Sequence, residues 1–268
     1  MYHTLAIDGR GLHAGQLARV VIAREPGPVR LSAGGRAVPV AELAVLAGAR
    51  STVVGVDGVR IGTVEHLFAA LGGAGIHDGL RIAIEGAELP ILDGCAMEWS
   101  VALADVPGRS PPRRVVRAAS FAIGASRYDF EPDDATHVAV TVDFADVRLA
   151  PHATWSGDRA DFVARIASAR TFGFAHEVDA LLARGLAQHV AASSVVVIAP
   201  DVIHHAGRPF TADEPARHKL LDLIGDLYAH GGPFRGRIHA TRPGHAATHA
   251  AMARAREEGV IASGLFVA

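Results

Sequence analysis

The sequence predicts a protein of the α+β class with two domains of similar plan. Strand-like and helix-like patterns occur in both halves of its 268 residues. Between the halves lies the segment ADVPGRSPPRR, residues 104–114, whose Pro, Gly, Ser and Arg are typical of a linker. Half of the residues are hydrophobic, which is enough for a sizeable core. We therefore predict an N-terminal domain over residues 1–106, a linker over 107–114 and a C-terminal domain over 115–268.

In the first half, apolar alternation predicts strands and a period of about 3.6 residues predicts helices. Thr63 is suited to cap the first of these helices, and Gly72 and Gly73 are suited to end it. The predicted strands are LARVVIA (17–23) and GLRIAIEG (79–86), and the predicted helices are TVEHLFAALGG (63–73) and AMEWSVALAD (96–105).

The second half repeats this mixture, and its strongest helix pattern covers residues 213–232. There Asp213 is a candidate N-cap, Pro215 falls in the first turn, and Gly231 and Gly232 end the helix. The other predicted helices are DFVARIASAR (161–170), EVDALLARG (177–185) and GHAATHAAMARAREEG (244–259), and the strands are VVRAASFAI (115–123), YDFEP (128–132), HVAVTVDF (137–144) and SSVVVIAP (193–200).

The composition argues against several classes of partner. The 26 Lys and Arg residues nearly balance the 28 Asp and Glu residues, so no basic surface for nucleic acid or acidic lipid is expected. Cys95 is the only cysteine, which rules out an intramolecular disulfide and favours a reducing compartment. We find no signal-peptide pattern in MYHTLAIDGRGLHAG and no apolar run of membrane-spanning length. We therefore expect a cytoplasmic protein without stable membrane insertion.

The helix predicted over 213–232 carries an imidazole and two carboxylates on one stripe. His218, Asp222 and Asp226 follow one another at intervals of four residues, beside an apolar stripe of Leu and Ile. A His and an Asp at this spacing can chelate one metal ion, and this donor pair suits Zn²⁺ or another borderline divalent ion. The alternative is a surface pair that stabilises the helix by a few tenths of a kcal/mol.

Two further segments contain candidate reactive side chains. Glu65 and His66 are adjacent in a predicted helix, so their side chains diverge by about 100° and can flank one pocket. His245 follows Gly244 at the start of a helix, where a nearby carboxylate such as Asp226 would favour its charged form. Taken singly, each has a simpler interpretation: an exposed Glu beside a packed His, and a His that caps or packs locally.

Together these residues make up the parts of a metal-assisted hydrolase. His66, His218 and Asp222 supply three ligands, and a catalytic zinc site has three protein ligands and one open position for water. Glu65 would take a proton from that water, and His245 would protonate the leaving group. This hypothesis requires the segments to meet in space, which spacing in the sequence does not show.

Six segments resemble, in order along almost the whole chain, the zinc-dependent UDP-3-O-acyl-N-acetylglucosamine deacetylases of lipid A biosynthesis. The resemblance implies Zn²⁺ held by His66, His218 and Asp222, Glu65 as general base, and His245 as general acid. The six segments are GRGLHAG (9–15), VRIGTVEHLFAALGGAGI (59–76), ELPILDGCA (88–96), SARTFGF (168–174), DEPARHKLLDLIGDLYAHG (213–231) and GHA (244–246).

The same resemblance implies roles for four more side chains. Asp226 would orient the acid, and the Thr171 hydroxyl would help to stabilise a tetrahedral oxyanion. Lys219 would bind substrate and offset developing charge, and Phe172 would lie near the sugar. The implied fold has a small sheet layered with two helices, plus an insert, in each domain, and the active site lies between the domains. The second insert would be a strand–helix–strand unit that forms a passage for the acyl chain. We expect a monomer whose substrate is a nucleotide sugar.

Two departures from the family pattern keep other functions open. Arg50 stands where family members usually have apolar residues, and VAAS, residues 190–193, replaces a glycine-rich segment. We assign Arg50 and Ser193 to substrate binding on the basis of their positions in these segments. One alternative is a paralogous zinc amidohydrolase acting on a different N-acyl sugar. Another is a non-catalytic binding protein on the same fold. A zinc protease is disfavoured because the sequence has no HExxH helix.

Overall fold

A computed structural model of the chain describes residues 4–13, 15–46, 48, 50–183, 185 and 187–263. Ala14, Ala49 and Arg184 belong to segments discussed above and lie outside the described residues. Within the described part of the chain, every helix falls short of the length or the apolar character needed to cross a membrane.

The first half forms a five-stranded sheet with the strand order β1-β2-β8-β3-β4. Strands β2 and β8 pair antiparallel, with Ile22 opposite Ile82. Leu80, Ile82 and Ile84 of β8 are buried while Arg81 between them is exposed, so one face of the sheet contributes to the core. The strands are β1 (Thr4–Arg10), β2 (Leu17–Pro28), β3 (Arg30–Ser32), β4 (Val38–Pro39) and β8 (Asp78–Glu85).

The second half forms a seven-stranded sheet in which β17 is central, and β12 runs parallel to β17. The path is β10-β11-β17-β12-β13, with β9 beside β17 and β18 beside β9. The strands are β9 (Arg113–Val115), β10 (Ala119–Ile123), β11 (Ser126–Glu131), β12 (Thr136–Thr141), β13 (His152–Trp155), β17 (Phe234–Thr241) and β18 (Ile261–Ser263).

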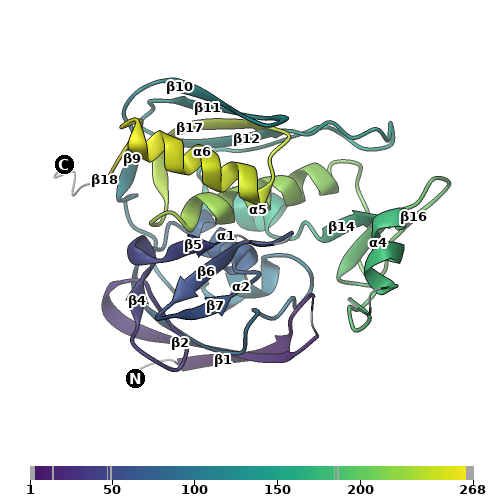
Figure 1. Ribbon diagram of the computed structural model, residues 1–268, viewed down its shortest axis with the longest axis horizontal. Helices are drawn as coiled ribbons and strands as arrows, with labels where there is room; N and C mark the ends of the chain where they lie inside the picture. The colour runs from purple at the N-terminus through teal and green to yellow at the C-terminus, as the bar shows by residue number, and fades with distance from the viewer. Residues whose placement is uncertain are drawn as a thin grey trace.

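The four main helices lie between these two sheets, which form the outer layers of the molecule (Figure 1). Buried residues of both sheets and of all four main helices belong to one continuous apolar core. The chain is thus an α+β protein of two similar halves, as predicted, whereas the boundaries at residues 106 and 115 stay a prediction. The helices are α1 (Glu65–Gly73) and α2 (Met97–Ala102) from the first half, and α5 (Glu214–Tyr228) and α6 (His245–Glu257) from the second.

Helices α1 and α5 approach each other closely because glycine stands at their crossing. A Cβ atom on Gly225 would lie 2.0 Å from the carbonyl oxygen of Glu65. A Cβ atom on Gly72 would lie 3.2 Å from Ile224. Every residue of α1 is buried, so this helix is held by packing on all sides. The contact brings the start of α1 against the C-terminal part of α5.

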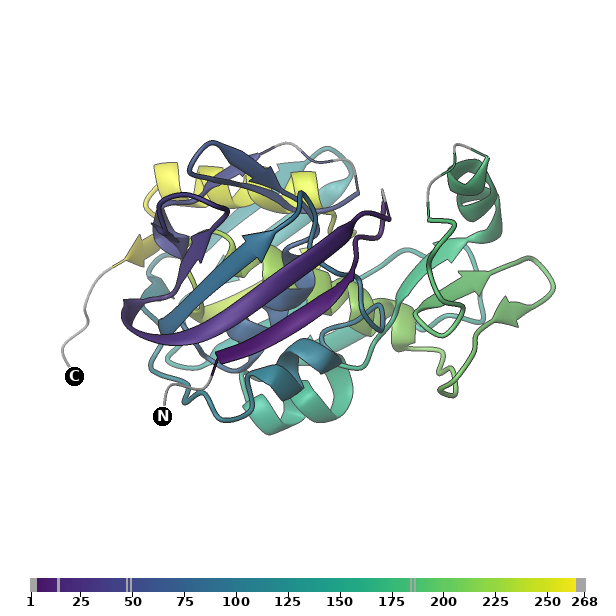
Figure 2. The same ribbon diagram turned by 90° about the horizontal axis from the view of Figure 1, so that it is seen from below.

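Two small three-stranded sheets complete the fold. One contains β5 (Ala44–Leu46), β6 (Val53–Val56) and β7 (Val59–Ile61). The other stands to one side of the layered body (Figure 2) and is built on a strand–helix–strand unit in which β14 and β15 are parallel. That unit contains β14 (Thr171–Phe174), α4 (Ala175–Leu182) and β15 (Val195–Ile198), followed by β16 (Ile203–His204).

Of the two predicted helix caps, Thr63 is wrong, whereas Asp213 is confirmed as the cap residue but makes no capping hydrogen bond. Thr63 precedes the cap position, which Val64 occupies; Thr63 has a φ of 56°, and its hydroxyl donates to Glu88 at 2.7 Å instead. Asp213 does occupy the cap position of α5, but its carboxylate accepts hydrogen bonds from Thr211 and Arg217 rather than from the helix backbone. In both cases a neighbouring side chain takes up the group that would otherwise cap the helix backbone.

The segment predicted as one helix over 161–170 is also different. A single helical turn, α3 (Arg159–Asp161), leads into a π-helix over Phe162–Ile166. The backbone N–H of Ala167 reaches the carbonyl of Phe162, five residues back, and the wider turn buries both Phe162 and Ile166.

Candidate metal centre

Three side chains from the two halves of the chain converge where α1 meets α5. One ligand atom from each of His66, His218 and Asp222 can be chosen so that all three lie within 4.8 Å of one another. The Nε2 atoms of His66 and His218 lie 3.8 and 3.5 Å from Asp222 Oδ1. All three residues are at most 7% exposed. Two imidazole nitrogens and one carboxylate oxygen facing a common point make a donor set that suits zinc.

The backbone orients one of these imidazoles. The Nδ1 atom of His218 lies 2.9 Å from the carbonyl oxygen of Ala169, so Nδ1 carries the hydrogen and donates it. Nε2 is then the nitrogen with a free lone pair, and it is the atom that faces Asp222. A ligand imidazole is commonly held in this way by its second nitrogen. The residues therefore fit a divalent metal ion.

Burial and neighbouring charges keep the cluster in the protonation states that a metal requires. Burial, helped by the adjacent His218, lowers the pKa of His66 to about 3, and burial also lowers the pKa of His218. Burial would raise the pKa of Asp222, but Lys219 and the nearby imidazoles outweigh it and hold that pKa well below its usual range. Lys219 donates to Asp222 Oδ2 at 3.0 Å. Neutral imidazoles beside an ionised carboxylate result.

A carboxyl group and an imidazole flank the cluster. Burial raises the pKa of Glu65 to about 7, although the charge of His245 opposes this shift. His245 donates through Nδ1 to Asp226, at 2.9 and 3.0 Å from its two oxygens. Burial would lower the pKa of His245, but Asp226 raises it to about 10. At neutral pH Glu65 can therefore act as a base and His245 as an acid beside the same cluster.

The remaining predicted site residues, which differ in their contacts, are Thr171, Phe172, Arg50 and Ser193. Thr171 begins β14, where its backbone N–H donates to Gly94. The ring of Phe172 meets that of His218 edge-on, with centroids 6.0 Å apart. Arg50 pairs with Glu177 of α4 at 3.1 Å. Ser193 is exposed, and among the described residues no hydrogen bond joins it to the cluster.

Sequence reasoning missed three residues behind Asp226. The hydroxyl of Thr52 donates to Asp226, and its backbone N–H donates to Glu65. His249 contacts Thr52, and His230 contacts His249. The spacing of four residues between His245 and His249 in one predicted helix was the available signal.

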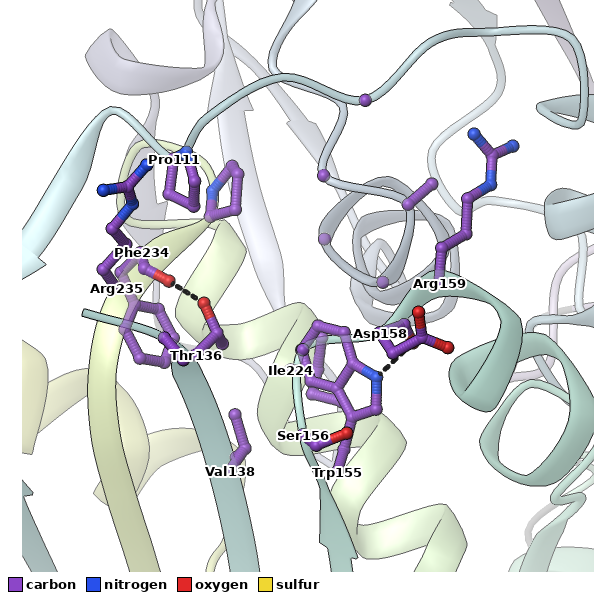
Figure 3. A pocket seen from close by; sticks show the side chains of 18 of the residues that line it. Pro111, Thr136, Val138, Trp155, Ser156, Asp158, Arg159, Ile224, Phe234 and Arg235 are labelled. Carbon is purple, nitrogen blue, oxygen red and sulfur yellow. Dashed lines mark hydrogen bonds between the residues drawn. The ribbon is translucent and has the colours of Figure 1, made fainter. Parts of the chain in front are cut away.

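A cavity of about 630 Å³ opens at the far ends of the same two helices, lined in part by Trp155, Thr136 and Arg235 (Figure 3). Hydrogen bonds fix two of its wall residues: Thr136 donates to the carbonyl of Phe234, and the Trp155 indole donates to that of Asp158. None of the predicted site residues lines this cavity, so we place the chemistry at the cluster instead.

Fold and site together define an α+β protein with a buried cluster of two histidines and an aspartate that could hold a divalent metal ion. Residues 1–256 match the model of the LpxC family, described as UDP-3-O-acyl N-acetylglycosamine deacetylase. The chain belongs to this family, which confirms the resemblance found in its sequence motifs.

Curated relatives carry the name UDP-3-O-acyl-N-acetylglucosamine deacetylase. One from Myxococcus xanthus is 36% identical over 261 residues, which cover 91% of this chain and 81% of the relative. One from Phenylobacterium zucineum is 35% identical over 257 residues, with 90% and 87% covered. A third, from Oleidesulfovibrio alaskensis, is 31% identical over 264 residues, with 91% and 83% covered.

Proposed function

We propose that the protein is a zinc-dependent hydrolase that removes the N-acetyl group from a UDP-3-O-acyl-N-acetylglucosamine substrate. The name carried by its relatives supports this reaction. The observation that carries the proposal is the convergence of His66, His218 and Asp222, from two halves of the chain, beside an acid and a base. A cytoplasmic monomer acting on a nucleotide sugar fits this proposal.

His66, His218 and Asp222 would hold the zinc ion. When bound, zinc lowers the pKa of a coordinated water and polarises a carbonyl group. Glu65 is buried and its carboxylate accepts a hydrogen bond from the Thr52 backbone N–H, and it accepts the proton that the attacking water loses. The neighbouring α5 backbone at Gly225 keeps Glu65 from moving away from the ligand helix. The base is thus fixed by packing before substrate arrives.

His245 donates a proton to the amine nitrogen as the amide bond breaks. Its Nδ1 atom is committed to Asp226, so Nε2 is the nitrogen that delivers the proton. The ionised Asp226 holds the imidazole ring in place and stabilises its charged form. The products are acetate and a free amine on the sugar.

Two polar groups are suited to stabilise the oxyanion. One is the hydroxyl of Thr171, the first residue of β14. Thr171 lies two residues after Ala169, whose carbonyl group orients His218. The Lys219 ammonium, raised in pKa by Asp222 despite its burial, stays charged beside the ligand carboxylate. Phe172, packed against His218, offers an apolar ring to the substrate.

One observation favours a second candidate, a related hydrolase acting on a different N-acyl sugar. The Arg50–Glu177 ion pair joins the first half of the chain to α4 of the strand–helix–strand unit. Charged groups at this position suit a polar or short acyl group better than a long apolar chain. Comparing kcat/KM for the 3-O-acylated and the unacylated UDP-sugar separates the two candidates, because a paralogue should not prefer the acylated one.

The decisive experiment measures zinc content and deacetylation together. Wild-type protein should contain one zinc per chain and lose activity on chelation. His218→Ala should lose both, whereas His152→Ala, which changes an exposed histidine outside the cluster, should lose neither. Normal zinc binding and full activity in His218→Ala would show that the assignment is wrong.

A further inference from the structure

A row of hydrogen bonds continues from Asp226 away from the candidate metal centre. The Thr52 hydroxyl oxygen lies 2.5 Å from Asp226 Oδ1 and 2.9 Å from His249 Nε2. The other ring nitrogen of His249, Nδ1, lies 3.0 Å from His230 Nε2. Four side chains from three separate segments are therefore linked in series. We call Thr52, His249 and His230 the buttress.

The chemistry of the carboxylate sets the direction of every hydrogen bond in this row. Asp226 is ionised and only accepts, so the single hydroxyl hydrogen of Thr52 points to it. His249 must then donate through Nε2 to the hydroxyl oxygen, which leaves its Nδ1 as an acceptor. His230 in turn donates through Nε2 to that atom. Each member donates toward Asp226, and both imidazoles are neutral.

The burial of His249 and His230 agrees with their assignment as neutral imidazoles. It lowers the pKa of His249, and it lowers the pKa of His230 to about 3 with help from the neighbouring His249 and Arg113. Neutral imidazoles are the only forms in which one nitrogen donates while the other accepts. Each contact in the row therefore joins one donor to one acceptor, and the Thr52 hydroxyl oxygen also lies 3.4 Å from His245 Nδ1, which donates to Asp226 at shorter range.

Thr52 links this row both to Glu65, the proposed base, and to Asp226, the partner of the proposed acid. It is fully buried, its hydroxyl holds Asp226, and its backbone N–H donates to Glu65 Oε2 at 3.0 Å. Asp226 in turn holds His245. A shift of Thr52 would thus disturb the partner of the acid and the base at once. His249 is the side chain that holds the Thr52 hydroxyl from behind.

The far end of the row reaches the surface. His230 follows the C-terminal end of α5 and lines a cavity of about 530 Å³ together with Ala41, Leu43 and Arg256. His249 lies one turn after His245 on α6. The buttress therefore ties the end of α5 and the first turns of α6 to the residue that contacts Glu65.

We infer that His249, backed by His230, is a positioning residue for deacetylation that acts through the Thr52 hydroxyl to fix Asp226. This inference rests on the proposed function, because it gives Asp226 and His245 their roles in that reaction. It adds the residues that keep the acid aligned. His249 contacts Thr52 and His230 and does not belong to the cluster of His66, His218 and Asp222, so we expect its effect on turnover rather than on binding.

Two amide substitutions at one position separate positioning from packing. In His249→Gln the amide nitrogen takes the place of Nε2 and still donates to Thr52. In His249→Asn the amide reaches only the place of Nδ1 and leaves the Thr52 hydroxyl without its donor. We expect His249→Asn to lower kcat about three- to tenfold, the worth of one hydrogen bond, with KM and zinc content unchanged. His249→Gln should restore most of the loss.

A double-mutant cycle tests the route through Thr52. Thr52→Val removes the hydroxyl and keeps the backbone N–H that serves Glu65. If His249 acts through this hydroxyl, adding His249→Asn to Thr52→Val should cause no further fall in kcat. Independent, additive losses would overturn the inference, as would equal losses in His249→Gln and His249→Asn, or no loss in either.

A second readout needs no turnover. Two-dimensional ¹H–¹⁵N spectra of the histidine rings in the wild-type protein should show His249 and His230 as neutral Nε2–H tautomers. The His245 Nδ1–H signal should persist in His249→Gln and broaden in His249→Asn. An Nδ1–H tautomer at His249 would reverse the row and overturn the inference. Absence of wild-type turnover with these spectra intact would count against the proposed function alone.

Discussion

Replacing Glu214 by Gln should destabilise the protein and loosen the metal centre. Glu214 is the first residue of α5, the helix that carries His218 and Asp222. Its carboxylate accepts from Arg170 Nε at 2.8 Å and from Nη2 at 3.0 Å, and it also accepts the Arg170 backbone N–H at 3.1 Å. Burial would raise the pKa of Glu214, but Arg170 outweighs it and lowers the pKa, so the group is ionised at neutral pH.

The size of the effect follows from the burial of the pair. The Arg170 side chain is fully buried and that of Glu214 is 5% exposed. Gln keeps one acceptor oxygen but leaves the guanidinium without a counter-charge and places an amide NH₂ against Nη2. Removing one charge from a buried pair costs about 3–5 kcal/mol. For a chain of this size the apparent Tm should fall by about 10 °C.

The assay compares thermal melts of metal-loaded protein with zinc titrations of the same variants. Asp8→Asn is the matched control, because Asp8 pairs with Arg19 at 3.2 Å on an exposed strand, and such pairs contribute at most about 1 kcal/mol. The double variant Arg170→Met with Glu214→Leu removes both charges and should recover much of the stability. A Glu214→Gln variant that melts within about 2 °C of wild type would refute this reasoning.

Three further results are expected. Glu65→Gln should lower turnover by about 10²–10⁴-fold while zinc content stays unchanged, because the three ligands remain. Gly225→Ala should cost about 1–3 kcal/mol and weaken zinc binding, since its Cβ would lie 2.0 Å from the carbonyl of Glu65, whereas Gly62→Ala, with no neighbour closer than 3.8 Å, should be tolerated in both assays. His230 has a folded pKa of about 3 against 6.5 when unfolded, so only the unfolded chain takes up this proton as pH falls below 6.5. Urea unfolding should therefore show stability falling by up to about 1.4 kcal/mol per pH unit between pH 6 and 4, and this slope should be shallower in His230→Gln.

Local sequence patterns determined most of the helices, several strands and the composition of the site. Helix α5 could be predicted because its apolar stripe and its Pro and Gly residues act within a few turns. The candidate ligand pair His218 and Asp222 could be predicted for the same reason, since residues four apart in a helix share one side of it. The ordered motifs then indicated the family, which the comparison confirmed.

The tertiary structure alone decided which of these residues meet. His66 is separated from His218 by most of the chain, and the two come together because Gly225 lets α5 lie directly on the backbone of α1. The three residues of the buttress, Thr52, His230 and His249, come from segments that are distant in the sequence and meet only in the folded chain. Thr63 does not cap α1 for the same reason, since its hydroxyl donates a hydrogen bond to the distant Glu88 instead. A sequence determines periodicity and local propensity, whereas long-range packing selects the partner of each polar group.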